Sequence, residues 1–426
     1  MNGGLSMVEM KSGYKMTEVG VIPEDWEVKN VSESCLIKAR IGWQGLKKSE
    51  YMSSGDYLLI TGTDFDNGQV NWKSCAYVSK ARYEQDSNIK IRPQDILISK
   101  DGTIGKVAYL GMIPKAGTLN SGIFVIRAND RKIDQVFLSK IFMSFYFEEF
   151  LNRLVAGSTI NHLYQKDFVK FCFPLPNSEE QTAIAAALSD VDSLISALIK
   201  KIEKKKAIKQ GLMQQLLTGK KRLPGFCGDW MTYSIEELFE LGNGYTPSKA
   251  ISSFWFNGTI PWFRMEDIRL HGRILKDSIQ HITLKAVKGG RLFPKDSIIL
   301  STTATIGEHA WLNVDSLANQ QFTFLMRKRS CCDTISVKYF FYYCYILGDW
   351  CRANINEGGL MAVNMEDLRK YNFAIPPTIS EQTAIANILS DCDSEIAALE
   401  KKRDKYKEIK QGMMQQLLTG KIRLIK

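Results

Sequence analysis

Acidic side chains that could do catalytic chemistry are present, but none stands in a recognised catalytic pattern. Asp64 with Asp66, and Glu266 with Asp267, have the residue type for general acid and base work. The chain has no GxxxxGK[ST] phosphate loop, no HExxH and no GxSxG, and Gly242-Asn-Gly244 lacks the third glycine of a dinucleotide fingerprint. We therefore interpret the acidic pairs as loop turns or hydrogen-bond acceptors, and we expect no catalytic residue.

Cysteine and histidine spacing gives no metal site. None of the cysteines forms a CxxC pair, and no histidine has a zinc-ligand spacing. We expect reduced cysteines and no metal or cofactor on this chain. The residues concerned are Cys35, Cys75, Cys172, Cys227, Cys331, Cys332, Cys344, Cys351 and Cys392, with His162, His271, His281 and His309.

Two long segments, which must position any functional side chains, are near copies of each other. Residues 180–223 (EQTAIAAALSDVDSLISALIKKIEKKKAIKQGLMQQLLTGKKRL) and 381–424 (EQTAIANILSDCDSEIAALEKKRDKYKEIKQGMMQQLLTGKIRL) agree at 32 of 44 positions. The flanking regions repeat faintly, as in Thr103-Ile-Gly105 and Thr305-Ile-Gly307. A repeat of this kind predicts two equivalent halves. The expected order is a first lobe at 14–177, a helix at 178–219, a second lobe at 220–378 and a helix at 379–426.

Both copied segments are predicted to be long helices. Ser178 and Ser380 follow proline-rich ends and precede glutamates, as helix starts do, and Gly219 and Gly420 are expected to end the helices. About 38 residues give a helix of roughly 57 Å. Apolar residues alternate at spacings of four and three, which is typical of a coiled-coil seam. The seam residues are Ile184, Leu188, Val191, Ile195 and Leu198, and then Ile385, Leu389, Cys392, Ile396 and Leu399.

The two seams most simply pair with each other in antiparallel fashion; the alternative is that each helix packs only on its own lobe. The middle of each helix is basic. That charge fits a solvated face or contact with phosphates or a partner. The basic residues are Lys200, Lys201, Lys204, Lys205, Lys206 and Lys209, and then Lys401, Lys402, Arg403, Lys405, Lys407 and Lys410.

The lobes are predicted to be mixed α/β (α+β). Short strand-forming runs at 95–99, 123–126 and 297–300 lie between Gly, Asn and Asp turns. A more helical stretch closes each lobe, at 137–154 and 337–352. The copied helices have stayed alike, whereas the lobes have diverged. We therefore expect the two helices to make the same kind of contact and the two lobes to recognise different ligands.

The net charge and the absence of an expected signal peptide or membrane span limit the classes of function that the sequence favours. The formal net charge is +10 and the pI about 9.0, which favours a polyanionic partner. Met1–Lys11 lacks the apolar core of a signal peptide, and the most apolar run, 339–347, is shorter than the roughly 18 residues of a membrane span. We expect a soluble, cytoplasmic protein that reads DNA in two parts.

These residues also resemble a known family. The lobe openings Thr17-Glu-Val-Gly-Val-Ile-Pro-Glu-Asp-Trp26 and Leu223-Pro-Gly-Phe-Cys-Gly-Asp-Trp230 are part of the resemblance. So are Gly244-Tyr-Thr-Pro-Ser-Lys249, the two Thr-Ile-Gly runs, Asn319-Gln-Gln321 and both EQTAI…KQG…QQLLTGK helices. In this order, and twice over, they resemble the specificity (S) subunit of type I restriction–modification systems across nearly the whole chain.

The resemblance implies a non-catalytic subunit with two target recognition domains joined by an antiparallel coiled coil. Each lobe would read one half of a split, asymmetric double-stranded DNA target, and the coiled coil would set the gap. Two modification subunits would dock here and carry S-adenosylmethionine for adenine methylation. Restriction subunits would supply ATP- and Mg-dependent translocation and cleavage.

The candidate DNA-binding residues are polar side chains in loops. Arg or Lys suits guanine, Asn or Gln suits adenine, and Ser or Thr suits several bases. The first lobe offers Arg40, Gln44, Lys47, Lys48, Thr61, Thr63, Ser99, Lys100, Asn120, Ser121, Asn161 and His162. The second offers Thr246, Ser248, Lys249, Arg264, Glu266, Arg269, Thr302, Thr303, Asn319, Gln320 and Gln321. Each could equally stabilise a turn.

Two other functions stay open at this point. One is a self-contained DNA methyltransferase or nuclease with an unrecognised site, which would bind S-adenosylmethionine by itself. The other is a coiled-coil scaffold whose lobes bind proteins. The missing catalytic motifs disfavour the first, and the divergent lobes disfavour the second.

Overall fold

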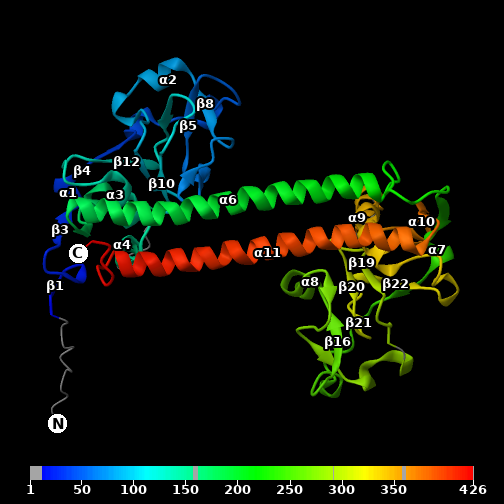
Figure 1. The fold of residues 1–426 in the computed structure, drawn as a ribbon. Coiled ribbons are helices and arrows are strands. Elements are labelled where there is room, and N and C mark those ends of the chain that lie inside the picture. Colours follow the sequence, from blue (N-terminus) through cyan, green and yellow to red (C-terminus); the bar gives the residue numbers. More distant parts are fainter. Residues whose placement is uncertain (1–11, 157–161, 291, 357–360, 426) are drawn as a thin grey trace, which may run out of the picture. The chain divides into compact units, whose positions relative to one another are not determined.

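The predicted architecture of two mixed α/β lobes joined by paired long helices is confirmed. The computed structural model describes residues 12–156, 162–290, 292–356 and 361–425. Its two long helices are α6 (Ser178–Leu216) and α11 (Ile379–Leu417), drawn in green and red to orange in Figure 1. The chain divides into unit 1, residues 1–199 and 402–426, and unit 2, residues 200–401. Each unit therefore contains one lobe, a part of α6 and a part of α11.

Lobe 1, the part of unit 1 outside these helices, is built on two small sheets. The first is antiparallel with strand order β10-β9-β12-β4, and the second has the order β11-β5-β8 with β11 parallel to β5. β9 and β12 are central because they are rich in buried β-branched residues. Their bounds are β4 Cys35–Ala39, β5 Tyr57–Ile60, β8 Ala76–Val78, β9 Ile96–Ser99, β10 Val107–Tyr109, β11 Gly117–Leu119 and β12 Ile123–Ala128.

Paired short strands and helices complete lobe 1. The two-stranded pairs are β1 (Tyr14–Thr17) with β2 (Gly20–Pro23), β3 (Glu27–Asn30) with β13 (Cys172–Leu175), and β6 (Phe65–Asp66) with β7 (Gln69–Val70). The α-helices are α1 Val31–Ser34, α2 Lys80–Glu84, α3 Gln135–Phe142, α4 Phe145–Ala156 and α5 Gln165–Phe168. The 3-10 helices are η1 Gly42–Gln44, η2 Lys48–Glu50, η3 Gly62–Asp64 and η4 Ser87–Ile89.

Lobe 2, the corresponding part of unit 2, repeats this plan with a larger main sheet. The main sheet has the order β15-β22-β19-β20-β17, and the second has the order β18-β16-β21 with β16 parallel to β21. The bounds are β15 Phe239–Asn243, β16 Ile260–Phe263, β17 Ile274–Leu275, β18 His281–Ile282, β19 Ile298–Ser301, β20 His309–Leu312, β21 Leu317–Ala318 and β22 Phe322–Arg327.

The remaining elements of lobe 2 pair its ends and close it. β14 (Met231–Ser234) pairs antiparallel with β23 (Asn372–Ile375). The α-helices are α7 Ile235–Leu238, α8 Met265–His271, α9 Val337–Ala353 and α10 Met365–Lys370. The 3-10 helices are η5 Ser252–Phe254, η6 Leu284–Ala286, η7 Lys288–Gly290 and η8 Arg329–Cys331. The helical stretch predicted to close each lobe is continuous here but is broken between α3 and α4 in lobe 1.

The caps of the long helices lie before the serines that the sequence suggested, by one residue in α6 and by two residues in α11. The Asn177 side chain accepts a hydrogen bond from the backbone of Glu180 (2.9 Å), and the Thr378 hydroxyl accepts one from Glu381 (3.2 Å). Ser178 lies inside the first turn of α6, as Ser380 does in α11, so neither serine is the cap. An N-cap oxygen three residues before its donor satisfies an otherwise free helix N–H.

Both helices end through a left-handed glycine, as expected. Gly219 has a φ of +69° and Gly420 a φ of +68°, three residues after the last helical residue in each case. Each glycine also lies against a tryptophan ring, Trp230 and Trp26 respectively. A side chain at either position would meet both the backbone strain and the ring, which explains why the LLTGK sequence recurs.

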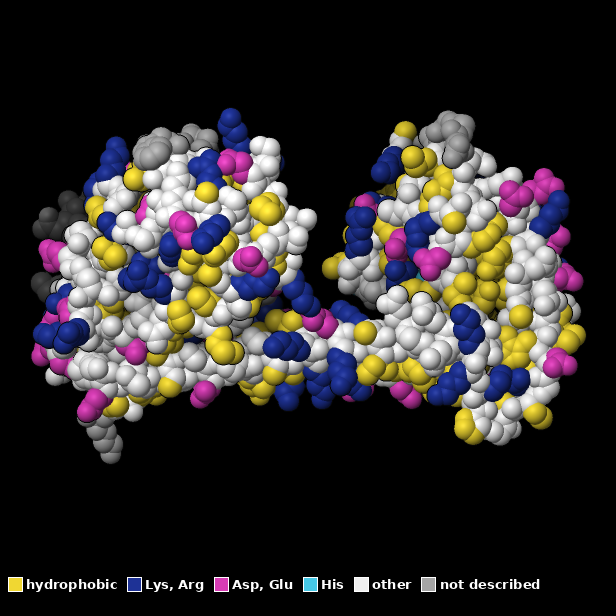
Figure 2. Space-filling view, turned by 90° about the horizontal axis from the view of Figure 1, so that it is seen from above, with side chains coloured by type: hydrophobic (Ala, Val, Ile, Leu, Met, Phe, Trp, Pro, Cys, Tyr) yellow, Lys and Arg dark blue, Asp and Glu magenta, His cyan; other side chains and the backbone are white. Residues whose placement is uncertain are grey.

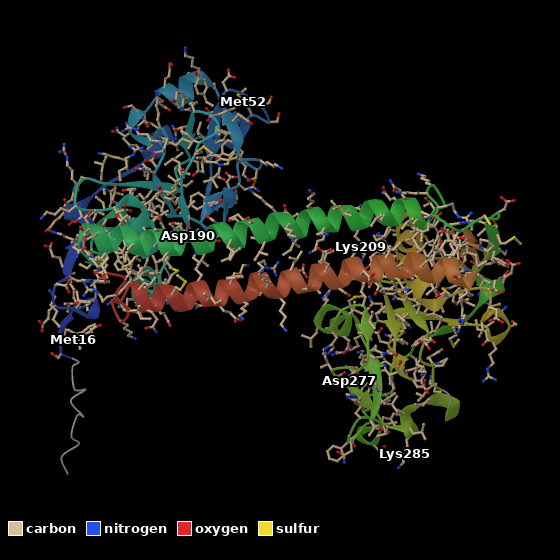
Figure 3. The ribbon with its side chains drawn as sticks, viewed as in Figure 1. Met16, Met52, Asp190, Lys209, Asp277 and Lys285 are labelled. Carbon is tan, nitrogen blue, oxygen red and sulfur yellow. The ribbon has the colours of Figure 1, made fainter. Side chains whose placement is uncertain are left out.

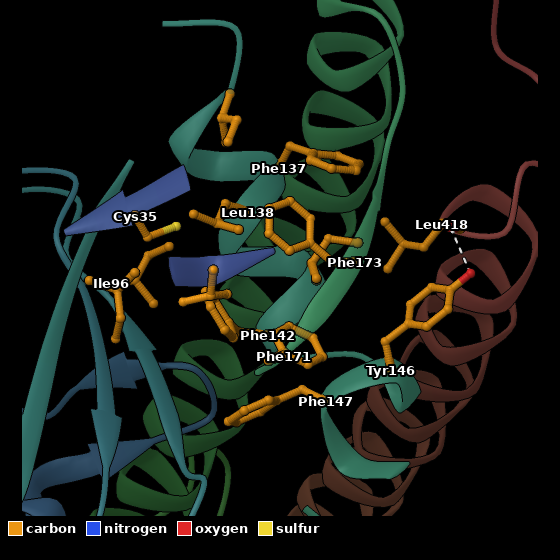
Figure 4. Packing of buried hydrophobic residues seen from close by; sticks show 14 of the residues in the cluster. Cys35, Ile96, Phe137, Leu138, Phe142, Tyr146, Phe147, Phe171, Phe173 and Leu418 are labelled. Atoms are coloured by element: carbon orange, nitrogen blue, oxygen red, sulfur yellow. Dashed lines mark hydrogen bonds between the residues drawn. The ribbon is translucent and has the colours of Figure 1, made fainter. Parts of the chain in front are cut away.

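Each lobe forms one hydrophobic core with the helix parts of its own unit. In unit 1, Ile184 and Leu188 of α6 and Leu418 after α11 pack with the buried phenylalanines of α3, α4 and β13. Figure 4 shows this aromatic cluster and the hydrogen bond from the Tyr146 hydroxyl to the Leu418 carbonyl oxygen (3.4 Å). In unit 2, Ile385 and Leu389 of α11 belong to the core with α9. The helices therefore pack on lobes as well as on each other.

Within each unit the parts of α6 and α11 run antiparallel. In unit 2, Lys205 pairs with Glu395 and Lys209 with Asp393, so residue numbers rise on one helix as they fall on the other. In unit 1, Asp192 of α6 pairs with Lys410 of α11 (2.6 Å). Part of the basic run in the helices is thus neutralised by acids of the facing helix.

One described helix, α6, is long and apolar enough to cross a membrane by length and composition alone. Its apolar side chains Ile184, Ala185 and Leu188 instead lie in the core of unit 1. A core helix of a soluble protein passes the same composition test, so this feature does not indicate a membrane span.

Candidate nucleic-acid interface

Polar loops of lobe 1 meet along one edge of its sheets, which we call polar edge 1. Three backbone hydrogen bonds hold it: Asn120 N to Ile60 O (3.0 Å), Lys100 N to Gly122 O (2.8 Å) and Leu163 N to Lys100 O (2.8 Å). These bonds join segments far apart in the chain. Polar edge 1 comprises residues 60–64, 99–106, 120–122 and 162–163.

Lobe 2 has the same frame, which we call polar edge 2. Asn319 N donates to Phe263 O (3.0 Å), Thr302 N to Gln321 O (3.1 Å) and Val363 N to Thr302 O (2.9 Å). Polar edge 2 comprises residues 263–267, 301–308, 319–321 and 362–363. These equivalent hydrogen bonds show which residue of lobe 1 corresponds to which residue of lobe 2. The lobe sequences have diverged too far to show this.

The repeated Thr-Ile-Gly runs form the tight turn in each edge. Gly105 N bonds to Ser99 O (2.8 Å) and Gly307 N bonds to Ser301 O (2.9 Å), with φ of +79° and +85°. A Cβ on Gly105 would meet Leu151 of α4, and one on Gly307 would meet the backbone of α9. Glycine is required because the turn is left-handed and packs against a helix.

Two acids considered as catalytic candidates have a structural role. Asp64 accepts from the backbone N–H of Thr61 (2.8 Å), and Asp267 accepts from that of Arg264 (2.7 Å). Both carboxyl side chains are buried. They fix the loop that follows β5 or β16, as the loop-turn interpretation proposed.

The side chains carried at equivalent points of the two edges differ. The pairs, lobe 1 first, are Thr61 and Arg264, Lys100 and Thr302, Asp101 and Thr303, Lys106 and Glu308, Ser121 and Gln320, and His162 and Ala362. Hydroxyl, cationic, acidic and amide groups exchange places on one backbone frame. The two edges therefore offer different hydrogen-bonding patterns to a ligand.

Most candidates of lobe 1 lie on polar edge 1, namely Thr61, Thr63, Ser99, Lys100, Asn120, Ser121 and His162. Several are engaged locally. Ser99 is buried and its hydroxyl donates to Thr103 O (2.6 Å), Asn120 accepts from Gly122 N (2.7 Å), and His162 pairs with Asp101. Burial lowers the pKa of the Lys100 amino group.

The other candidates of lobe 1 lie elsewhere. Arg40 is 2% exposed, and its guanidinium donates to Leu119 O (2.8 Å) and the Thr118 hydroxyl (3.0 Å), so it supports β11 from behind. Gln44 is also buried, whereas Lys47 and Lys48 are exposed around η2. Asn161 falls outside the described residues.

Several candidates of lobe 2 contact other residues of polar edge 2. The Thr246 hydroxyl donates to the Gln320 side chain (2.5 Å), Gln321 donates to the Thr305 hydroxyl (2.7 Å), and Arg264 lies 3.8 Å from Glu266. Thr302 is buried against Thr323. Thr303 and Asn319 also lie on polar edge 2, whereas Ser248, Lys249 and Arg269 lie outside it and are exposed, Arg269 on the last turn of α8.

Some residues of the edges escaped the sequence analysis. Asp101, Lys106, Thr305 and Glu308 flank the Thr-Ile-Gly turns, and their proximity to the other loops depends on long-range sheet pairing. The repeat of the turn was a usable signal, because it placed the same loop twice. In the space-filling view, Lys and Arg lie on both lobes and along the helices and are mixed with acids (Figure 2).

Repeated glutamines attach each lobe to a helix. Gln181 accepts from Asp134 N (2.8 Å) and donates to the carbonyl oxygens of Lys132 and Pro176. In unit 2, Gln382 makes the equivalent three bonds, to Ser336 N and to the carbonyl oxygens of Thr334 and Pro376. Because all partners are backbone groups, lobes of different sequence can be held in the same way.

Repeated charges connect the helix ends. Arg423, beyond the end of α11, pairs with the buried Glu180 at the start of α6, and Arg222 pairs with the buried Glu381 in the same way. The Trp26 indole donates to Glu180 (3.0 Å), whereas the equivalent Trp230 nitrogen has no partner. These contacts explain why the copied segments begin with Glu-Gln and end with Arg-Leu.

A repeated aspartate joins both helices to each lobe. Asp192 accepts from Lys410 and from Lys140 of α3, and burial, which would raise its pKa, is outweighed by these lysines, which lower it. The equivalent Asp393 accepts from Lys209 (2.6 Å) and from the Tyr342 hydroxyl (2.9 Å). Figure 3 labels Lys209 on α6.

One buried histidine lies behind polar edge 2. His309, the first residue of β20, packs edge-on against Phe341 and Tyr345, and burial lowers its pKa to about 3. Arg273, close by, also disfavours its protonation. Within the described ranges, no group of three or more His, Cys, Asp or Glu residues is placed to hold a metal ion.

Comparison with protein families finds a match in both halves. The family described as type I restriction modification DNA specificity domain matches residues 23–210 and 228–411, which together form most of the chain. This match defines a protein with two DNA specificity domains. The chain belongs to this family and is a type I restriction–modification specificity subunit, which recognises the DNA target and is itself non-catalytic. The family binds no cofactor itself.

Relatives agree with this assignment. The chain is 46% identical over 174 residues to the EcoprrI specificity subunit of Escherichia coli, a match that covers 41% of this chain and 43% of that protein. It is 26% identical over 434 residues to the putative MjaX specificity subunit of Methanocaldococcus jannaschii, covering 97% of both. The first match covers less than half of each protein, and the second covers nearly all of both.

Solved structures share the fold. The type I restriction–modification S subunit of M. genitalium matches with a TM-score of 0.57 at 15% identity, covering 96% of this chain and 99% of that one. A chain from a structure of type I restriction–modification complex assembly and conformational transition matches with a TM-score of 0.55 at 17% identity, covering 94% and 99%. At these identities the likeness concerns the fold alone.

Proposed function

We propose that the two polar edges each read one half of a split, asymmetric DNA target. The observation that carries the proposal is one backbone frame that occurs twice with different side chains at six equivalent points. Base readout needs hydrogen-bonding side chains on a rigid support, and phosphate contacts fix the register without reading sequence. Exposed lysines such as Lys48 and Lys249 suit phosphates.

The helices serve as the shared part of the assembly in this proposal. They set the gap between half-sites and dock two modification subunits, which carry S-adenosylmethionine, while restriction subunits supply ATP- and Mg-dependent cleavage. The complex works in the cytoplasm. Repeated contacts by Gln181 and Gln382 support this role, since they hold each lobe to its helix through backbone groups alone.

The working boundaries follow the same logic. The recognition domains are residues 14–177 and 220–378, and the helical parts are 178–219 and 379–426. Within the seam, Ile184, Leu188, Ile385 and Leu389 are fully buried in lobe cores, and Ile195, Leu198 and Ile396 are also buried. Val191, Cys392 and Leu399 are half-buried.

A lobe exchange tests the proposal. Residues 231–375 begin and end on β14 and β23, which pair with each other, so this segment can be replaced by that of a relative without cutting the sheet. The variant is produced with its modification subunits in a host without other adenine methylation, and methylated sites are sequenced. We expect one half-site to change while the other half and the gap stay as they were.

The matched control exchanges residues 27–175, which are bounded by the paired strands β3 and β13. It should change the other half-site only. Exchanges that alter both half-sites together, or neither, would show that the lobes do not read separate halves.

A further inference from the structure

Arg264 stands at a rigid point of polar edge 2. It directly follows Phe263, the last residue of β16, and the Phe263 carbonyl oxygen accepts a hydrogen bond from Asn319 N. Its own backbone N–H is held by Asp267, which is fully buried and also accepts from Ile279 N (2.7 Å). A side chain on such a support is positioned before any ligand arrives.

The guanidinium of Arg264 has no hydrogen-bond acceptor among the described residues. Its carbon atom lies 5.8 Å from the ring centre of the buried Trp262, and its Nε atom is buried without a hydrogen-bond partner. Glu266 approaches only to 3.8 Å. Among the buried and half-buried arginines that the structure describes, only Arg264 has no hydrogen-bond acceptor for its guanidinium. Its two terminal nitrogens are neither buried nor hydrogen-bonded, so they are the donors that an external acceptor can reach.

The negative charge of Glu266 favours a neutral acceptor over an anionic one for the Arg264 guanidinium. Glu266 places a carboxylate beside the guanidinium, which disfavours a phosphate because both are anionic. A neutral base edge suffers no such repulsion. Thr246 and Gln320, on the same edge, add side chains of the type that read bases.

Guanine is the base that fits this donor. Its O6 and N7 atoms are adjacent acceptors in the major groove, and the arginine fork can donate to both at once. Resting on the proposed function, we propose that Arg264 reads a guanine in the half-site of lobe 2. Lobe 1 lacks this reader, because its equivalent residue, Thr61, uses its hydroxyl to bond Asp64 (2.8 Å).

The experiment compares Arg264→Thr, Arg264→Gln and Arg264→Lys with Arg329→Thr as the control. Arg329 is an exposed residue of the 3-10 helix η8 and lies outside polar edge 2, so the control removes the same charge from the same lobe. Each full-length variant is assembled with its modification subunits. The methylated motif is sequenced, and binding to duplexes with each of the four bases is measured over a salt series.

In wild type we expect a guanine in the half-site assigned to lobe 2 by lobe exchange. Arg264→Thr should reduce the preference for it by about 10- to 100-fold, leaving the other half-site and the salt slope unchanged. Arg264→Gln should shift the preference towards adenine, since amides pair with that base. Arg329→Thr should keep the guanine.

Other outcomes overturn the inference. A half-site without guanine, or a guanine retained by both Arg264→Thr and Arg264→Gln, means that Arg264 does not read it. A salt slope lowered by about one with base preference intact identifies a phosphate contact. Should Arg264→Thr fail to fold in a thermal melt, Arg264→Lys and Arg264→Gln decide alone. Absence of any two-part motif in wild type is a different failure, that of the proposed function.

Discussion

Unit 1 and unit 2 share the contacts that repeated residues of the copied helices make with backbone groups and with each other, and they differ where side chains of the lobes supply the partner. Gln181 and Gln382 bond equivalent backbone groups, and both buried glutamates receive an arginine from the other helix end. Yet Asp192 takes Lys140 from its lobe, whereas Asp393 takes Tyr342. The comparison shows that the helix residues are constrained because they contact each other. A lobe needs to keep only the backbone hydrogen bonds that hold its polar edge, so its side chains can change.

We expect the largest effect from replacing the two equivalent glutamines. Gln181→Leu and Gln382→Leu each delete three hydrogen bonds and leave buried or half-buried backbone groups unpaired, at about 1–3 kcal/mol per buried unpaired group. We expect each variant to destabilise its own unit by about 3 kcal/mol or more, and by similar amounts. Hydrogen exchange followed by mass spectrometry on the full chain reports each unit separately. Unequal losses would show that the contacts are not energetically equivalent.

A second test uses a difference in acid sensitivity. His309 occupies the position that Val107 holds in lobe 1, and its pKa of about 3 lies below the ordinary 6.5. The unfolded chain therefore binds a proton that the folded one excludes, so stability falls as the pH drops below 6.5. We expect unit 2 to lose about 2 kcal/mol between pH 6.5 and 5 through this group.

His309→Val, which copies lobe 1, should remove that part of the acid sensitivity. The measurement is the unfolding free energy of unit 2 by hydrogen exchange at both pH values, with unit 1 as the internal control. An identical pH dependence in the variant and wild type would contradict the assignment.

The smallest effect separates the two tryptophans. Trp26→Phe removes a hydrogen bond to the buried Glu180, whereas Trp230→Phe removes a nitrogen that has no partner. Both substitutions lose the same ring volume. Trp26→Phe should therefore lower the free energy of unfolding by about 1–2 kcal/mol more than Trp230→Phe, because only Trp26 also loses a hydrogen bond. Thermal unfolding of both variants measures the difference. A larger loss for Trp230→Phe would mean that its indole nitrogen is satisfied in solution.

The sequence by itself determined the duplication, the two long helices, the lobe and helix order and the family. These follow from local signals, since a 32-of-44 identity, a four-three apolar spacing and a left-handed glycine are visible along one stretch of chain. It also placed candidates such as Arg264, Asn319 and Gln320 in the loops that form polar edge 2.

Tertiary structure alone decided which of these loops meet and which polar side chains are free. Arg40 looked like a base reader, but strand β11 lies over it and accepts its hydrogen bonds. Arg423 meets Glu180 across 243 residues of chain, and Asn319 meets Phe263 through a parallel strand pair. Such contacts depend on sheet order and on long-range packing, for which the spacing of residues along a single sequence carries no signal.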